Sequence, residues 1–136
     1  MTVKLSDKMQ AFVAEVFPAL IGTSRRDGSI QMNALWFEYR DGYFWLNGGP
    51  DRLWLKRVQR TNSVDLFLID PKDMFRWAQV HGRLVSITGG EEAEAHINQL
   101  SQRYFGRPYR HMRDPDPRLR IQVEPLKVRS SVDGWR

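Results

Sequence analysis

A cluster of basic residues follows a turn-forming segment near the middle of the chain. Residues 48–51, Gly-Gly-Pro-Asp, interrupt regular structure, and Asp51 can cap a helix over residues 52–60. Arg52, Lys56 and Arg60 are four residues apart, so they share one face of that helix. Backbone N–H groups at a helix N-terminus, the helix dipole and an arginine fork all attract phosphate. The spacing indicates a phosphate site, and a solvated basic helix face is the alternative.

Two amide side chains lie on the long strand that we expect over residues 29–39. Gln31 and Asn33 share one face of that strand, opposite Met32 and Ala34. Amides on a sheet can hydrogen-bond the edge of a flavin-like ring or a phosphate tail. An exposed strand face with no ligand is the alternative.

The residue types needed for several other chemistries are missing or badly spaced. The chain has no cysteine, which excludes disulfides, thiolate metal sites and a thiol nucleophile. His81, His96 and His111 do not stand at metal-ligand spacing, so we expect no metal, and His96 reads as a structural residue. The nucleophile-elbow, dinucleotide and P-loop motifs are absent. No catalytic residue is identified, which suits a protein whose cofactor performs the chemistry.

Length and charge limit the remaining choices. The 136 residues fit a single domain over 1–136, and the formal net charge of +5 suggests an anionic partner. No secretion signal or membrane-spanning run is visible, so we expect a cytoplasmic protein with no membrane contact. Five tryptophans are more than so small a core can easily bury. Some of them should therefore face a subunit interface or a flat ligand.

The hydrophobic periodicity predicts a mostly β chain of the α+β class. Asp-Gly turns at 27–28 and 41–42 separate runs rich in aromatic and β-branched residues, as in an antiparallel meander. Six strands with too little helix to cover two faces favour closure into a barrel. The expected elements are helix 6–17, strands 19–24, 29–39 and 43–47, helix 52–60, strands 64–69 and 75–88, helix 91–105 and strand 118–124.

The order and spacing of several segments match a known family. The segments are 19–23 with 27–29, 31–37, 51–52 with 56–60, 64–68, 77–83 and 103–109. Through them the chain resembles the pyridoxamine 5'-phosphate oxidase-like split β-barrel family, especially its small members that use the deazaflavin coenzyme F420. The resemblance implies a six-stranded antiparallel split β-barrel with two or three flanking helices. It also implies a homodimer with the cofactor at the subunit interface.

The same resemblance implies a function and a set of site residues. The function is hydride transfer between F420 and a conjugated organic substrate, with FMN as the alternative cofactor and little help from side chains. Trp54 stands where the family usually has a lysine, and it could stack on a flat ring while Lys56 supplies charge nearby. An apolar groove lined by Trp36, Trp77 and Tyr109 would suit a quinone, an enone or a tetrapyrrole. The candidate cofactor-binding residues are Gln31, Asn33, Trp36, Arg52, Trp54, Lys56 and Trp77.

Two other classes of protein share some of these features. A small barrel that binds single-stranded nucleic acid would also combine basic charge with aromatic rings. We expect no nucleic-acid partner, because the aromatics form no clustered recognition motif and the charge is spread along the chain. The second alternative is a family member that binds a cofactor without catalysis.

Overall fold

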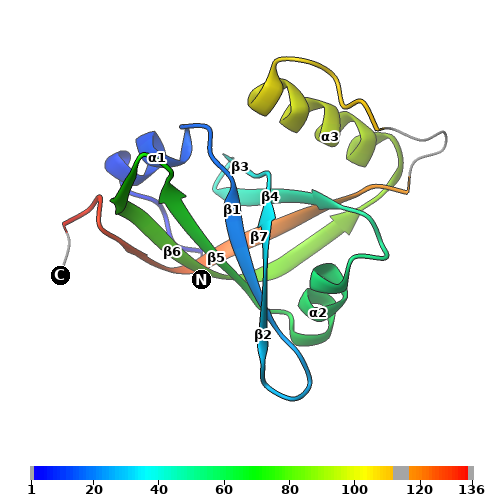
Figure 1. Ribbon diagram of the computed structural model, residues 1–136, viewed down its shortest axis with the longest axis horizontal. Coiled ribbons are helices and arrows are strands. Elements are labelled where there is room, and N and C mark those ends of the chain that lie inside the picture. The colour runs from blue at the N-terminus through cyan, green and yellow to red at the C-terminus, as the bar shows by residue number, and fades with distance from the viewer. Residues whose placement is uncertain (1, 112–116, 135–136) are drawn as a thin grey trace.

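The computed structural model describes residues 2–111 and 117–134 (Figure 1). Trp135 lies outside these residues. No helix among them is long and apolar enough to span a bilayer. The elements in chain order are α1 Asp7–Val13, β1 Ala19–Ser24, β2 Ile30–Leu35, β3 Glu38–Arg40, β4 Tyr43–Gly48, α2 Leu53–Thr61, β5 Val64–Asp70, β6 Asp73–Thr88, α3 Gly90–Phe105 and β7 Leu119–Ser130.

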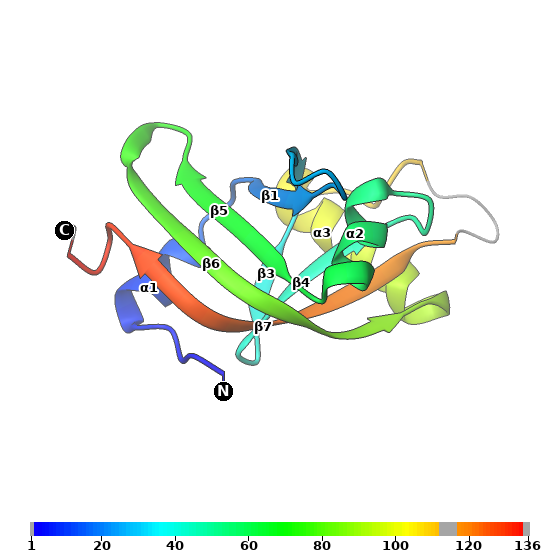
Figure 2. The same cartoon turned by 90° about the horizontal axis from the view of Figure 1, so that it is seen from below.

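The strands form one antiparallel sheet in the order β2-β1-β5-β6-β7-β4-β3. Its two edge strands, β2 and β3, are consecutive in the chain and are joined only by Trp36 and Phe37. A sheet whose opposite edges are two residues apart must curl round on itself, and Figures 1 and 2 show this curl. The curled antiparallel sheet with flanking helices confirms the predicted mostly β split barrel.

The strand count differs from the prediction at one place. The single strand expected over residues 29–39 is two strands, β2 and β3, so the sheet has seven strands rather than six among the described residues. The break falls at Phe37, whose N–H donates to the hydroxyl of Tyr104 at 3.1 Å instead of to a neighbouring strand. Because Tyr104 lies on α3, the break depends on a contact that the local sequence does not reveal.

The barrel interior is filled by alternate residues of the strands. Buried side chains of β1, β4, β5, β6 and β7 form one core cluster together with Phe37, Trp54, Leu55 and Val58. The helix α1 adds Met9, Phe12 and Val13 to the same cluster. All the described strands therefore enclose a single core.

The first helix is shorter than the predicted helix over residues 6–17. Ser6 caps it as expected, its hydroxyl accepting from the N–H of Met9 at 3.1 Å, but α1 ends at Val13, and Val16 is 51% exposed. Arg103 of α3 donates to the carbonyl oxygens of Val13 and Glu15 at 3.0 and 2.8 Å. A cation at these carbonyls satisfies the end of the helix at this point.

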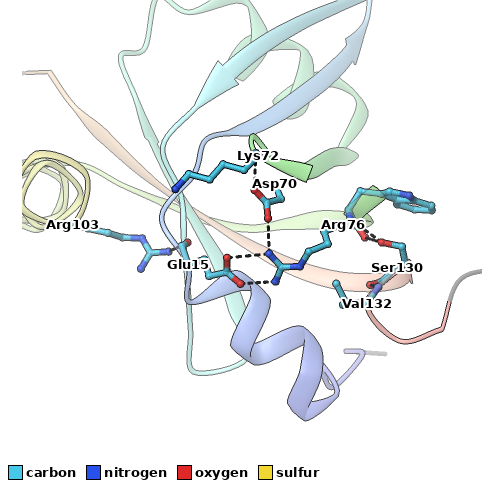
Figure 3. A network of polar contacts seen from close by, with 9 residues as sticks. Glu15, Asp70, Lys72, Arg76, Arg103, Ser130 and Val132 are labelled. Carbon is cyan, nitrogen blue, oxygen red and sulfur yellow. Dashed lines mark hydrogen bonds and ion pairs between the residues drawn. The ribbon is translucent and has the colours of Figure 1, made fainter. Parts of the chain in front are cut away.

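A second arginine links the same loop to the β5–β6 turn (Figure 3). Arg76 lies between Glu15, at 2.7 Å, and Asp70, at 2.5 Å. The N–H of Lys72 and then Arg76 hold the pKa of Asp70 below its usual value. The hydrogen bonds that Arg76 donates to Glu15 and Asp70 raise the pKa of Arg76. The segment after α1 is thus fixed by Arg103 on one side and Arg76 on the other.

We predict that Arg103→Ala lowers the free energy of unfolding by about 1–3 kcal/mol, because three carbonyls at the end of α1 lose a charged donor. Urea unfolding followed by circular dichroism measures this. Arg107→Ala is the control, since exposed Arg107 contacts the exposed ring of Phe105, and the expected change is under about 0.5 kcal/mol. Equal losses in both variants would contradict the prediction.

Candidate functional site

A pocket of about 370 Å³ lies where β2, the end of β4, the start of α2, α3 and the residue before β7 meet. Its volume falls in the range of roughly 300–1,000 Å³ that small-molecule sites occupy. Four of the seven candidate residues line it: Asn33, Trp36, Arg52 and Trp54. The structure therefore brings together the strand amide, the helix arginine and two of the aromatic residues.

An aromatic cluster holds Trp36 at the pocket. The Trp36 ring stacks on Tyr104 with centroids 5.2 Å apart, and the ring of Tyr109 meets it edge-on at 6.4 Å. The Tyr104 hydroxyl donates to the carbonyl of Phe17 at 2.7 Å and accepts from Phe37, which fixes its ring. Burial raises the pKa of Tyr104, so it stays a neutral phenol. One wall of the pocket is thus a rigid stack of rings.

Trp54 forms part of the pocket lining and part of the core. Its side chain is 5% exposed and belongs to the core cluster with Leu55 and Val58. A Cβ added to Gly48 would lie 2.7 Å from the Trp54 ring, so the ring packs directly on the glycine backbone. This close packing shows how an indole fits where the resemblance leads us to expect a lysine.

The start of α2 offers polar groups to the same pocket. Arg52 is the N-cap residue and no side chain caps the helix, so the expected cap by Asp51 is wrong. The first N–H groups of an uncapped helix lack intrahelical partners. Asn33 lines the pocket too, and its buried Oδ1 has no hydrogen-bond partner among the described residues. The exposed guanidinium of Arg52 and an unpaired amide oxygen are groups that an anionic, hydrogen-bonding ligand would satisfy.

A second hollow, which we call the basic cleft, lies between α2 and the β1–β2 turn. It measures about 310 Å³ and is lined by Arg25, Arg26, Leu53, Lys56, Arg57 and Arg60. Arg25 and Arg26 come from the β1–β2 turn, which lies beside α2 in Figures 1 and 2. These two arginines were not identified as site residues from the sequence, because only the hairpin brings them to the helix.

The basic cleft also accounts for two of the candidate residues. Lys56 lines it, so Arg52 and Lys56 serve two different hollows rather than one phosphate site. Gln31 accepts a hydrogen bond from Arg57 through its Oε1, and Arg60 donates to the carbonyl of Ser24. These contacts tie the β1–β2 hairpin to α2. Gln31 therefore shapes the cleft and does not line the pocket.

Trp77 is the candidate that the structure places farthest from the expectation. It lies on β6, where its ring stacks on Phe67 of β5 with centroids 5.7 Å apart, and it does not line the pocket of its own chain. Its neighbours Ala78 and Val80 point into the core. Trp77 therefore belongs to an outer face of the barrel.

No three His, Asp or Glu side chains converge as a metal site in residues 2–111 and 117–134.

A buried polar pair adjoins the pocket and was not identified as functional from the sequence. Asn47 lines the pocket at 8% exposure, and its Nδ2 donates to the carbonyl of Ala93 at 3.0 Å and to His96 Nδ1 at 3.2 Å. His96 is 1% exposed. Burial, and after it the charges of Arg120, Arg40 and Arg118, lower its pKa to about 4. His96 is therefore neutral near pH 7 and accepts through Nδ1.

The curled antiparallel sheet, whose two edge strands are joined by Trp36 and Phe37, defines a split β-barrel with a pocket between the start of α2 and an aromatic wall. The chain matches the family profile described as Pyridoxamine 5'-phosphate oxidase over residues 5–131. The protein belongs to this family.

Solved structures with the same fold are distant in sequence. An F420 reductase is 23% identical with a TM-score of 0.77, over 88% of this chain and 94% of that one. A conserved hypothetical protein from Mycobacterium tuberculosis is 21% identical with a TM-score of 0.75, over 99% and 91%. A proposed pyridoxamine 5'-phosphate oxidase from Listeria innocua is 16% identical with a TM-score of 0.71, over 93% and 98%. No curated protein matches the chain.

We predict that His96→Gln flattens the pH dependence of stability between pH 4 and 6.5. The pKa of His96 is about 4 in the folded protein and near 6.5 in the unfolded chain, so the unfolded state binds more protons in the window between these two pH values. The wild-type free energy of unfolding thus falls as pH falls through it, by at most about 1.4 kcal/mol per pH unit. Urea unfolding at several pH values measures both slopes. They should agree above pH 6.5, and equal slopes inside the window would contradict the prediction.

Proposed function

We propose that this protein is an oxidoreductase that transfers a hydride between coenzyme F420 and a conjugated organic substrate, with FMN as the alternative cofactor. Membership in the pyridoxamine 5'-phosphate oxidase family and the fold shared with an F420 reductase support a flavin-type cofactor. The observation that carries the proposal is the pocket itself. It combines Arg52 at an uncapped helix start, the unpaired buried Oδ1 of Asn33 and an aromatic wall.

Each part of the pocket has a role toward such a cofactor. Arg52 and the first N–H groups of α2 would hold a phosphate, since both donors and dipole favour an anion there. Asn33 would hydrogen-bond a polar edge of the ring system. Trp54 provides a flat apolar surface for the cofactor ring, and Trp36 and Tyr109 leave a second such surface for a conjugated substrate. Bound there, the cofactor would supply the hydride chemistry that no side chain of this chain provides.

The basic cleft favours F420 over FMN. FMN carries one phosphate, whereas the side chain of F420 carries a phosphodiester followed by glutamate residues. Five cationic side chains line the cleft: Arg25, Arg26, Lys56, Arg57 and Arg60. A cofactor with a single phosphate at Arg52 leaves them unused, while a longer anionic tail that passes α2 would meet them.

We propose further that two copies of the chain complete the site as a homodimer. The pocket is open, and the edge strand β2 beside it exposes Ile30 and Met32, at 58% and 59%. Large apolar side chains this exposed on an edge strand favour contact with another chain. The half-exposed Trp77 and Phe67 pair on the outer barrel face is a second such surface, and it offers Trp77 to the site of the partner.

We predict that F420 binds more tightly than FMN and that Arg25→Ala/Arg26→Ala weakens F420 by about tenfold or more, the loss expected for charged contacts. The same double variant should change FMN affinity by less than about twofold, since FMN does not reach the cleft. Arg52→Ala should weaken both cofactors, because it removes the phosphate contact that they share. Fluorescence titrations of the purified protein with each cofactor measure these affinities.

The control for this titration is Lys72→Ala, at an exposed lysine in the β5–β6 turn away from both hollows. Equal loss of F420 and FMN affinity in the double variant would remove the cleft from F420 recognition. No binding of either cofactor would overturn the proposed function. Cofactor binding with no turnover of any quinone or enone would leave a binding protein rather than an enzyme.

We predict that Met32→Glu converts a dimer into a monomer, because a charge would be buried in the contact. Light scattering after size exclusion measures the mass of both proteins. Glu91→Gln, at an exposed position in the first turn of α3, is the control and should leave the mass unchanged. A monomeric wild-type protein in the presence of cofactor would contradict the dimer.

A further inference from the structure

Arg118 lines the pocket just before β7, and its guanidinium is held by neutral groups. Its Nε donates to Asn47 Oδ1 at 2.8 Å, and its NH1 lies 3.4 Å from the hydroxyl of Tyr109. The guanidinium also lies 5.2 Å from the centre of the Tyr109 ring. No ion pair within residues 2–111 and 117–134 involves Arg118. Its positive charge is therefore oriented at the pocket without a carboxylate from the described chain to neutralise it.

The orientation of Arg118 depends on the orientation of the Asn47 amide. Both hydrogens of Asn47 Nδ2 are in use, one on the carbonyl of Ala93 and one on His96 Nδ1, so Oδ1 faces Arg118. A flipped amide would set its oxygen against the Ala93 carbonyl and its NH₂ against the guanidinium. Both contacts would be repulsive at 8% exposure. The three groups thus fix a single arrangement.

His96, on the buried face of α3, completes this arrangement. Its Nδ1 is the acceptor that holds one hydrogen of Asn47, so the neutral ring carries its proton on Nε2. That Nε2 lies 3.8 Å from Glu38 Oε1, and Glu38 pairs with Arg40 at 3.2 Å. Neither His96 Nε2 nor Glu38 Oε1 has a hydrogen-bond partner among the described residues, so the hydrogen-bonded chain runs from His96 through Asn47 to the arginine at the pocket.

We infer that Arg118 binds the carbonyl oxygen of a planar conjugated substrate in this pocket, and that Asn47 and His96 are positioning residues for it. The inference rests on the proposed function and narrows its substrate class to quinones and α,β-unsaturated carbonyl compounds. A guanidinium held by neutral partners beside aromatic rings is an oriented positive charge that can stabilise a developing negative charge. Trp36 and Tyr109 supply the flat surface against which such a substrate would lie.

The chemistry gives Arg118 a defined task. The substrate receives a hydride at its β-carbon, the C=C electron pair moves toward the carbonyl, and the oxygen becomes an enolate oxygen. The donor of the hydride, the reduced deazaflavin or flavin of the proposed function, balances this two-electron reduction by its own oxidation. Arg118 pairs with the enolate oxygen as the charge develops, and a proton from water at the α-carbon completes the product.

The test uses two planar probes that differ in charge and needs no turnover. The carboxylate of 2-naphthoate stands in for the enolate oxygen, and 2-naphthamide is its neutral counterpart. Calorimetric titration of the cofactor-free protein should show that Arg118→Met lowers the affinity for naphthoate by about tenfold or more. This is the effect expected from the loss of one charged hydrogen bond. The affinity for naphthamide should change by less than about threefold in the same variant. Arg118→Lys should recover part of the affinity for naphthoate.

Variants of His96 separate positioning from stability. His96→Leu removes the acceptor for Asn47 and should weaken naphthoate more than naphthamide. His96→Gln keeps an acceptor and should restore the difference between the probes, whereas a merely structural role would weaken both probes equally. Arg120→Met is the matched control, two residues further along β7, where Arg120 pairs with Glu92 at 2.9 Å and does not line the pocket. It should leave both affinities unchanged.

Two results would overturn the inference. The first is equal naphthoate affinity in the wild-type protein and Arg118→Met. The second is an Arg118→Met variant that loses F420 or FMN but keeps naphthoate, which would make Arg118 a cofactor contact. If naphthoate binding depends on Arg118 while the wild-type protein binds neither cofactor, the oxygen-binding role of Arg118 holds and the proposed hydride transfer fails.

Discussion

The two residues that join β2 to β3 constrain the whole molecule. Trp36 and Phe37 connect opposite edges of one sheet, so the sheet has to curl until those edges are adjacent. Phe37 is fully buried in the core, and its backbone pairs with Tyr104 of α3 instead of with a strand. Trp36 stacks on the same tyrosine and lines the pocket. Closure of the barrel and the position of the aromatic wall therefore depend on the same contacts with Tyr104.

Helix α3 has a central part in this arrangement, although it lines the pocket only with the apolar side chains of Ile97 and Leu100. Arg103 fixes the end of α1, Tyr104 fixes the strand break, and His96 fixes Asn47 beneath the pocket. These side chains lie on one helix of 16 residues, so they move together. Displacing α3 would open the end of α1, loosen Trp36 and free the Asn47 amide at once. The geometry of the pocket is tied to the packing of this helix.

The sequence predicted the parts of the structure that depend on local patterns. Alternation along the strands, the Asp-Gly turns and the three helices follow from periodicity and turn chemistry, and the family resemblance placed Asn33, Trp36, Arg52 and Trp54, which share one pocket. The break at Phe37 was missed because Tyr104 is 67 residues away. Arg118 and Asn47, 71 residues apart, were missed for the same reason. Trp77 lies outside the pocket of its own chain, and one chain does not show which outer face meets a partner, so its place at the site stays a prediction.

Trp54 stands where the family usually has a lysine, and this difference changes where positive charge lies in the pocket. A lysine at a position that is 5% exposed, packed on Gly48 and among core residues, would carry a buried ammonium, which is costly. The indole instead gives the pocket an apolar floor with Ile97 and Leu100. Charges at the rim act more strongly over such a floor, because less water screens them. Within the pocket itself, positive charge then rests on Arg52 and Arg118.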